Sequence, residues 1–144
     1  MKIRIISFGK IKDASVGELI DYYTKLTERY VTVEQISLKD TSSELITYDQ
    51  IKDQIDGFTV ILTENGKDYT SRGFSTFLYK KFVDFGTVTF IIGNAFGFEL
   101  EVVSGVNSTL SLSKLTFPHE IAHMLLVEQL YRAMNIQSGG KYHK

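Results

Sequence analysis

The chain of 144 residues contains no cysteine and a single proline. Without cysteine it has no disulfides, no thiolate ligands for zinc or iron–sulfur clusters and no cysteine nucleophile. It also lacks a long apolar run. Residues 2–6 alternate charged and hydrophobic side chains, and no stretch approaches the roughly 18 residues of a membrane span. We therefore expect no export signal and no membrane partner, and we expect a cytoplasmic protein.

An excess of charge of one sign is missing as well. The chain has 16 Lys and Arg against 17 Asp and Glu, a formal net charge of −1. This average argues against a strongly cationic nucleic-acid binder. The charges are unevenly placed, because residues 1–12 and 129–144 carry cations and no acid, whereas residues 31–60 are acidic. Random surface variation is one explanation of this pattern, and basic binding surfaces at both ends are the other.

The hydrophobic pattern predicts one globular domain, residues 1–144, of the α/β class. Runs rich in β-forming residues predict strands at 2–8, 31–37, 58–62, 87–92 and 110–112. The run at 87–92 is predicted to be a central strand. Helical periodicity predicts helices at about 15–30, 45–55, 74–85, 98–106 and 118–136, the first two opened by the capping boxes Ser15–Glu18 and Thr41–Glu44. A turn is expected at 64–67. Strands separated by helices call for a mostly parallel sheet with helices on both faces.

In such sheets ligands bind beyond the carboxyl ends of the strands, so the loops after Leu62, Ile92 and Leu112 are candidates. Gly93 directly follows the central strand and lets the backbone approach a ligand, although the glycines of 93–97, read alone, are better explained by a structural turn. Residues 111–116 are rich in hydroxyls, which either bind a ligand or satisfy turns and cap the last helix.

The last helix is apolar on nearly every side, and a chain of this length has few places to bury it. We therefore expect a homodimer formed through this C-terminal helix. Its histidines form the pattern His119-Glu120-x-x-His123, which matches zinc hydrolases. His143 is the only evident third ligand, and we therefore expect no metal, with a zinc enzyme kept as an alternative.

Four ordered motifs, with matching separations along the whole chain, closely resemble the ribosomal large-subunit methyltransferase H family of the SPOUT superfamily. They are Phe90-Ile-Ile-Gly93, the run Ser111–His119, Glu128-Gln-Leu-Tyr-Arg-Ala133 and Lys141-Tyr-His143. The resemblance implies a homodimeric enzyme that uses S-adenosylmethionine to methylate N3 of a pseudouridine in 23S rRNA of the assembled ribosome. It also implies a C-terminal deep trefoil knot, a rare exception to ordinary connection rules.

The resemblance further assigns cofactor binding to the three candidate loops. The residues are Leu62, Gly93, Leu112, Ser113, Lys114, Leu115, Thr116 and Phe117. Leucine side chains and exposed loop backbone suit an adenine ring, and a sulfonium methyl group mainly needs alignment with the attacking nitrogen.

Three residues near the C-terminus are the catalytic candidates. His143 is the candidate base for the N3 proton, Tyr142 orients or stacks on the base, and Arg132 binds a phosphate or oxygen. A disordered tail and a simple Glu128–Arg132 pair are the structural alternatives.

Asn94 and His123 depart from the family pattern, which usually has glycine and arginine there. We expect Asn94 to preserve the turn, since asparagine tolerates positive φ. The departures motivate the alternative function, a non-catalytic ribosome- or RNA-binding dimer with the same fold. In either function a dimer could place the Lys2–Lys12 face of one subunit near the Arg132–Lys144 tail of the other and so form a composite surface for RNA.

Overall fold

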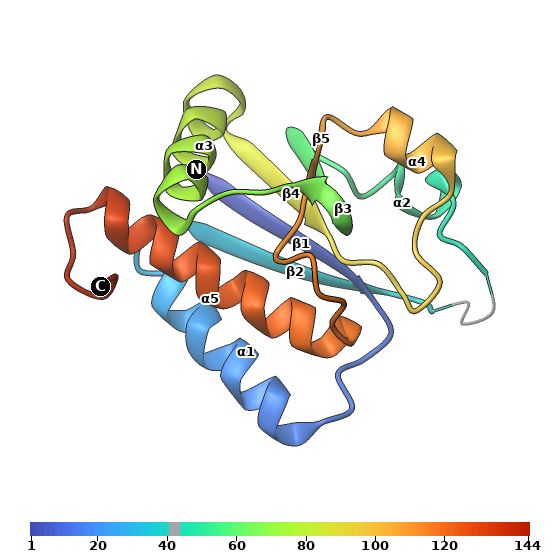
Figure 1. Ribbon diagram of the computed structural model, residues 1–144, viewed down its shortest axis with the longest axis horizontal. Helices are drawn as coiled ribbons and strands as arrows, with labels where there is room; N and C mark the ends of the chain where they lie inside the picture. Colours follow the sequence, from blue (N-terminus) through green and yellow to red (C-terminus); the bar gives the residue numbers. More distant parts are fainter. Residues whose placement is uncertain (41–43) are drawn as a thin grey trace.

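The computed structural model describes residues 1–40 and 44–144, and strands alternate with helices along it (Figure 1). The elements are β1 Lys2–Phe8, α1 Ala14–Thr27, β2 Thr32–Leu38, α2 Tyr48–Ile51, β3 Phe58–Lys67, α3 Ser71–Phe85, β4 Thr87–Ile91, α4 Leu100–Gly105, β5 Ser108–Leu110 and α5 His119–Gln137. Within the described residues no helix combines the length and apolarity needed to cross a membrane.

The five strands form one parallel sheet in the order β2-β1-β4-β3-β5. β4 lies at the centre, as its uninterrupted run of β-branched and aromatic residues predicts. Phe90 of β4 pairs with Ile5 on one side and with Val60 on the other. Because all strands point the same way, their carboxyl ends lie along one edge of the sheet.

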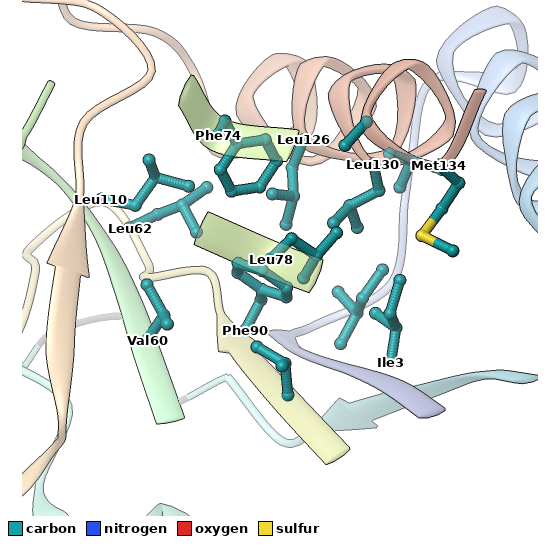
Figure 2. Close-up of a cluster of buried hydrophobic side chains, with 14 of the residues drawn as sticks. Ile3, Val60, Leu62, Phe74, Leu78, Phe90, Leu110, Leu126, Leu130 and Met134 are labelled. Carbon is teal, nitrogen blue, oxygen red and sulfur yellow. The ribbon is translucent and has the colours of Figure 1, made fainter. Parts of the chain in front are cut away.

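Helices cover both faces, so the predicted α/β class is confirmed. α1, α3 and α5 pack over one face, and Figure 2 shows strand side chains meeting those of α3 and α5. The shorter α2 and α4 cover the other face. The larger cluster includes Ile3, Val60, Leu62, Phe74, Leu78, Phe90, Leu110, Leu126, Leu130 and Met134. Each such side chain contributes roughly 1.5–3 kcal/mol when fully buried.

One side of α5 is buried within the single chain. The helix lies against both α1 and α3 (Figure 1), with Leu126, Leu130 and Met134 buried beneath it. The single chain therefore buries the side of the helix that faces the sheet, but not the whole helix. Ile121, Met124 and Leu125 remain partly exposed.

The first two helices begin differently from the prediction. α1 is capped by Asp13, whose carboxylate accepts from the backbone N–H groups of Ser15 and Val16, so the Ser15–Glu18 box is wrong. The Thr41–Glu44 box involves residues 41–43, outside the described part. α2 begins only at Tyr48, because Ile46 forms a parallel bridge with Phe98 and cannot join the helix, and it ends at Ile51.

The turn predicted at 64–67 is instead the end of β3. Lys67 pairs with Leu110 of β5, and its carbonyl accepts from the N–H of Ser111 at 2.9 Å. Polar residues occupy this extension because it runs beyond the covered part of the sheet, where Glu64 and Asn65 are exposed. The turn predicted from these polar residues is therefore wrong.

The four cations at the N-terminus do not form one basic face. Lys2 and Arg4 lie at the amino end of β1 and pair with Glu34, at 3.4 and 2.9 Å. The Arg4 hydrogen bond lowers the pKa of the Glu34 carboxyl. Lys10 and Lys12 follow the other end of this strand, about 20 Å away. The proposed Lys2–Lys12 face is therefore reduced to Lys10 and Lys12.

We expect Gly17→Ala to stabilise the protein by about 0.5–1 kcal/mol, since glycine in a helix interior costs about that much relative to alanine. An added Cβ at Gly17 would meet Ile11 at 3.6 Å, an ordinary contact, and the residue lies within α1. Urea unfolding measures the change. A decrease in the midpoint would show that this turn of α1 needs glycine.

Candidate functional site

The three predicted loops meet at the carboxyl edge of β4, β3 and β5. Leu62 pairs with Leu110, and the preceding residue, Ile61, pairs with Ile91. Adjacent strands are about 4.8 Å apart, so Leu62, Gly93 and the segment after Leu110 are close neighbours. The loop residues Leu112, Ser113, Lys114, Leu115, Thr116 and Phe117 continue from this edge to α5.

Gly93 lies against the ring of Phe98. A Cβ at Gly93 would be 3.0 Å from that ring, so any side chain would displace it. The next residue, Asn94, holds the turn through its side chain, whose oxygen accepts from the N–H groups of Phe96 and Gly97 at 2.9 and 3.0 Å. Positive φ occurs only at glycines in the described part of the chain, so positive φ is not why asparagine suits this position.

Hydroxyls of residues 111–116 hold their own loop. Ser111 is buried and donates to the carbonyl of Ser113, whose hydroxyl accepts from the N–H of Leu115. Thr116 donates to the Glu64 carboxylate. None of these hydroxyls caps α5, whose N-cap residue is Pro118. Of the two structural roles predicted for them, satisfying turns is therefore confirmed and capping the last helix is wrong. A shallow depression of about 540 Å³ lies here, lined by Glu64, Asn65, Gly66, Asp68, Lys114 and Thr116.

The catalytic candidates form a second cluster, because the C-terminal tail folds back onto α5. Arg132 pairs with Glu128, donates to Nδ1 of His143 at 3.1 Å and stacks 4.8 Å from the Tyr142 ring centre. The Tyr142 hydroxyl donates to Glu128 at 2.8 Å. The backbone N–H of Tyr142 donates to Asn135. Arg132 therefore does more than pair with Glu128. The C-terminal tail is packed against α5, in contrast to the disordered tail that was the alternative.

This packing sets the hydrogen-bonding roles of the cluster. Burial, followed by bonds to Tyr23 and Glu128, raises the pKa of Tyr142, so its hydroxyl stays protonated and donates. The hydrogen bond to Glu128 raises the pKa of Arg132. A guanidinium has only donors, so Nδ1 of His143 accepts and the proton of the neutral ring lies on Nε2.

Within one chain the two clusters are separate. Arg132 lies 14 residues beyond Pro118, which is about 20 Å along a helix rising 1.5 Å per residue. Figure 1 shows the C-terminus near one end of α5 and the loop that precedes α5 at the other. Sequence reasoning missed Asn135 as an anchor of the tail, although a buried polar residue in an apolar helix is a recognisable signal.

The residues of the zinc pattern have other partners. Nε2 of His123 lies 3.0 Å from Gln35, and the Glu120 carboxylate accepts from the N–H groups of Lys12 and Asp13. In residues 1–40 and 44–144 no three His, Asp or Glu side chains gather as metal ligands would. The zinc alternative gains no support.

We expect His123 to make the protein less stable in acid. Burial, together with the charge of His119, lowers the pKa of His123 to about 4, against 6.5 for a free histidine. Between these values the unfolded chain binds a proton that the folded chain excludes, so stability falls as the pH drops from 6.5 to 4. Between pH 7.5 and pH 4.5 this histidine lowers the free energy of unfolding by about 2 kcal/mol.

Urea unfolding of the wild type and of His123→Gln at both pH values measures this term. The variant should lose less stability than the wild type by that amount. Equal losses would contradict the prediction.

A parallel sheet with helices on both faces and loops gathered at the carboxyl edge of its strands is the architecture in which many α/β proteins bind small molecules. A family model described as "Predicted SPOUT methyltransferase" matches residues 1–143. The chain belongs to the SPOUT methyltransferases and, among them, to the family of ribosomal RNA large subunit methyltransferase H.

Relatives with that name are similar over their full length. The protein of Acholeplasma laidlawii is 38% identical over 152 aligned residues, with all of both chains covered. That of Prochlorococcus marinus strain NATL2A is 43% identical, covering 98% of this chain and 94% of its own. A Streptococcus pneumoniae relative is 33% identical with both chains fully covered.

Proposed function

We propose that this protein transfers a methyl group from S-adenosylmethionine to N3 of a pseudouridine in 23S rRNA of the assembled ribosome, in the cytoplasm. The observation that carries the proposal is the full-length similarity to relatives named ribosomal RNA large subunit methyltransferase H. The meeting of Leu62, Gly93 and the 112–117 loop at one sheet edge supports it.

The residues at this edge fit the proposed cofactor. Gly93 has no side chain, and a Cβ there would fill the space beside Phe98. Leu115 and Thr116 are exposed and offer loop backbone, while buried Leu62 supplies an apolar wall. S-adenosylmethionine, when bound, supplies an already activated methyl group. The loops hold it in line with the attacking nitrogen and exclude water.

His143, Tyr142 and Arg132 are the proposed residues around the target base. Arg132 is a fixed cation for a phosphate or a developing oxygen charge. Tyr142 positions the base through its ring and hydroxyl. His143 receives the N3 proton after its Nδ1 bond to Arg132 opens, since that bond occupies the lone pair of the neutral ring.

We place these two halves of the site on different subunits of a homodimer. The 20 Å between them along α5 separates them within one chain, whereas a symmetric partner can bring its tail to the loops of the first. The partly exposed apolar residues of α5 and Leu19 and Tyr22 of α1, which are 43% and 57% exposed, suit such an interface.

The proposal includes the trefoil knot. Leu62 and Lys67 of β3 both pair with Leu110 of β5, so the chain between them leaves β5 and returns to it, and Gly66 lies against the backbone of Leu110 and Ser111. We take this close approach as a crossing of β3 over the start of the C-terminal segment. That segment then continues into α5 between α1 and α3. Both features suit a chain end that is threaded through a loop.

Calorimetry and mass spectrometry test the function together. The purified protein should bind S-adenosylmethionine, and Gly93→Trp should abolish binding, whereas the control Tyr79→Trp, at an exposed position of α3, should not. The pseudouridine-containing rRNA fragment from a deletion strain should lack the mass of one methyl group.

Wild-type expression should restore that mass. Cofactor binding that Gly93→Trp leaves unchanged would refute the proposed cofactor site. A methyl group that persists in the deletion strain would favour the alternative, a non-catalytic ribosome-binding dimer. The intact turn at Asn94 removes one motive for that alternative.

A further inference from the structure

The turn that ends α5 directs the C-terminal tail, residues 138–144, back along the helix. Gly139 has a φ of +76°, and its N–H donates to the carbonyl of Ile136 at 3.1 Å. The N–H of Gly140 donates to the carbonyl of Asn135 at 2.9 Å. These two bonds form a Schellman motif, in which a glycine with positive φ closes the helix. Asn135 therefore lies directly beside the start of the tail.

The side chain of Asn135 makes a second contact with the tail. It belongs to a buried residue, 8% exposed. Its Oδ1 accepts from the backbone N–H of Tyr142 at 3.1 Å, and its Nδ2 donates to the Tyr30 hydroxyl at 3.2 Å. A backbone N–H can only donate, so the amide oxygen must face Tyr142. Because a buried polar group without a partner is unfavourable, these two bonds fix the orientation of the amide.

Gly140 leaves room for this amide. A Cβ at Gly140 would lie 2.4 Å from both Oδ1 and Nδ2 of Asn135, closer than Cβ atoms approach other heavy atoms. Gly140 is not among the glycines with positive φ, so alanine can adopt its backbone conformation. What this position requires is therefore the absence of a side chain, so that the Asn135 amide can reach Tyr142.

Other contacts of the tail involve the groups that are proposed to meet the substrate. Arg132 donates to Nδ1 of His143 and lies over the Tyr142 ring, whose hydroxyl donates to Glu128. In the proposed reaction the bond between Arg132 and His143 opens, and Arg132 and Tyr142 contact the RNA. The bonds from the tail to Asn135 use main-chain N–H groups and none of these side chains. They can therefore persist while the side-chain bonds change.

We propose that Asn135 is a positioning residue for methyl transfer. Its amide, fitted against Gly140, holds the backbone of Tyr142 in place while the side chains of Tyr142 and His143 act on the target base. The inference rests on the proposed function for the reaction itself. A group that takes a proton from one atom of a base tolerates little displacement, since a shift of about 1 Å can cost a hundredfold in rate.

Gly140→Ala tests the inference without removing a polar group. The added methyl group would push the flexible Asn135 amide away from Tyr142. We expect an unchanged urea midpoint and a kcat for methyl transfer to ribosomes that falls about tenfold. The KM for S-adenosylmethionine should change by less than about threefold, because the loops and not the tail are proposed to bind the cofactor. Asn135→Ala should show the same division between kcat and KM.

The double variant separates positioning from two unrelated structural effects. If the amide and the bare glycine act as one unit, Gly140→Ala adds no further loss to Asn135→Ala, and kcat falls about tenfold in total rather than a hundredfold. Ser138→Ala is the matched control, because the Ser138 hydroxyl donates to the carbonyl of Asn135 at 2.9 Å and leaves the amide untouched. It should keep the wild-type kcat.

Hydrogen exchange of the Tyr142 amide, followed by NMR, gives a readout that needs no activity. It should become about tenfold faster in Asn135→Ala and Gly140→Ala and stay unchanged in Ser138→Ala. A wild-type kcat in Gly140→Ala, additive losses in the double variant, or unchanged Tyr142 exchange would each overturn the inference. A wild-type protein that transfers no methyl group would refute the proposed function, and the exchange rates would still decide whether Asn135 holds the tail.

Discussion

Co-expression of Gly93→Trp with Arg132→Ala is expected to restore about a quarter of the wild-type methyl transfer, although each variant alone loses a hundredfold or more. Gly93→Trp fills the cofactor loop, and Arg132→Ala removes the cation that contacts both Tyr142 and His143. If each site combines the loops of one subunit with the tail of the other, half of the dimers are mixed and carry one intact site.

Two affinity tags on the co-expressed chains isolate the mixed dimer, and incorporation of labelled methyl groups into ribosomes measures its activity. Mixed dimers as inactive as the parents would contradict a site shared between subunits. Arg132→Ala alone should bind S-adenosylmethionine normally, which separates loss of the tail cluster from unfolding.

Gly66→Ala is expected to destabilise the protein by about 3 kcal/mol or more, a large value for one substitution. Its Cβ would lie 2.7 and 2.8 Å from the backbone carbon and nitrogen of Leu110, at the crossing of β3 over β5. Backbone atoms cannot move aside as a flexible side chain does, so the crossing must open. Urea unfolding measures the loss, with Gly17→Ala as the control that adds the same methyl group harmlessly.

The same crossing leads directly into the 112–117 loop, so the folded fraction of Gly66→Ala should also bind S-adenosylmethionine more weakly. Gly57→Ala provides the comparison, because its Cβ would meet the Thr87 carbonyl oxygen at 2.1 Å, at the opposite edge of the sheet. We expect it to be unstable but to retain cofactor affinity when folded. A stable Gly66→Ala protein would show that the backbones separate easily.

Much of the fold followed from local sequence patterns. The run Thr87–Ile92 predicted a central strand, and Pro118 marked the beginning of α5, both as observed. The predictions failed where a distant segment competes with the local pattern. Ile46 lies within the helix predicted at 45–55 but pairs with Phe98, and residues 64–67 look like a turn but belong to β3, whose Lys67 pairs with Leu110 of β5.

The candidate site divides in the same way. The three loops were predicted from parallel topology alone, because every strand of such a sheet ends at one edge. The tail cluster was named from a resemblance, and the Glu128–Arg132 pair was foreseen from the spacing of four residues. Only the packing of the tail revealed that Glu128 also accepts from Tyr142. No spacing in the sequence indicates how the Gln35 amide is oriented toward Thr24 and His123. Nor does any spacing indicate that Nδ1 of His123 has no hydrogen-bond partner within residues 1–40 and 44–144.

The sequence by itself determined the α/β class and the order of its elements, since periodicity and glycine placement act over a few residues. Tertiary structure decided which partners those residues meet. It paired Lys2 and Arg4 with Glu34, whereas Lys10 has no ion pair in the described part of the chain. It also folded the tail onto α5, some 20 Å from the loops. These outcomes depend on contacts between segments far apart in the chain, which no local pattern records.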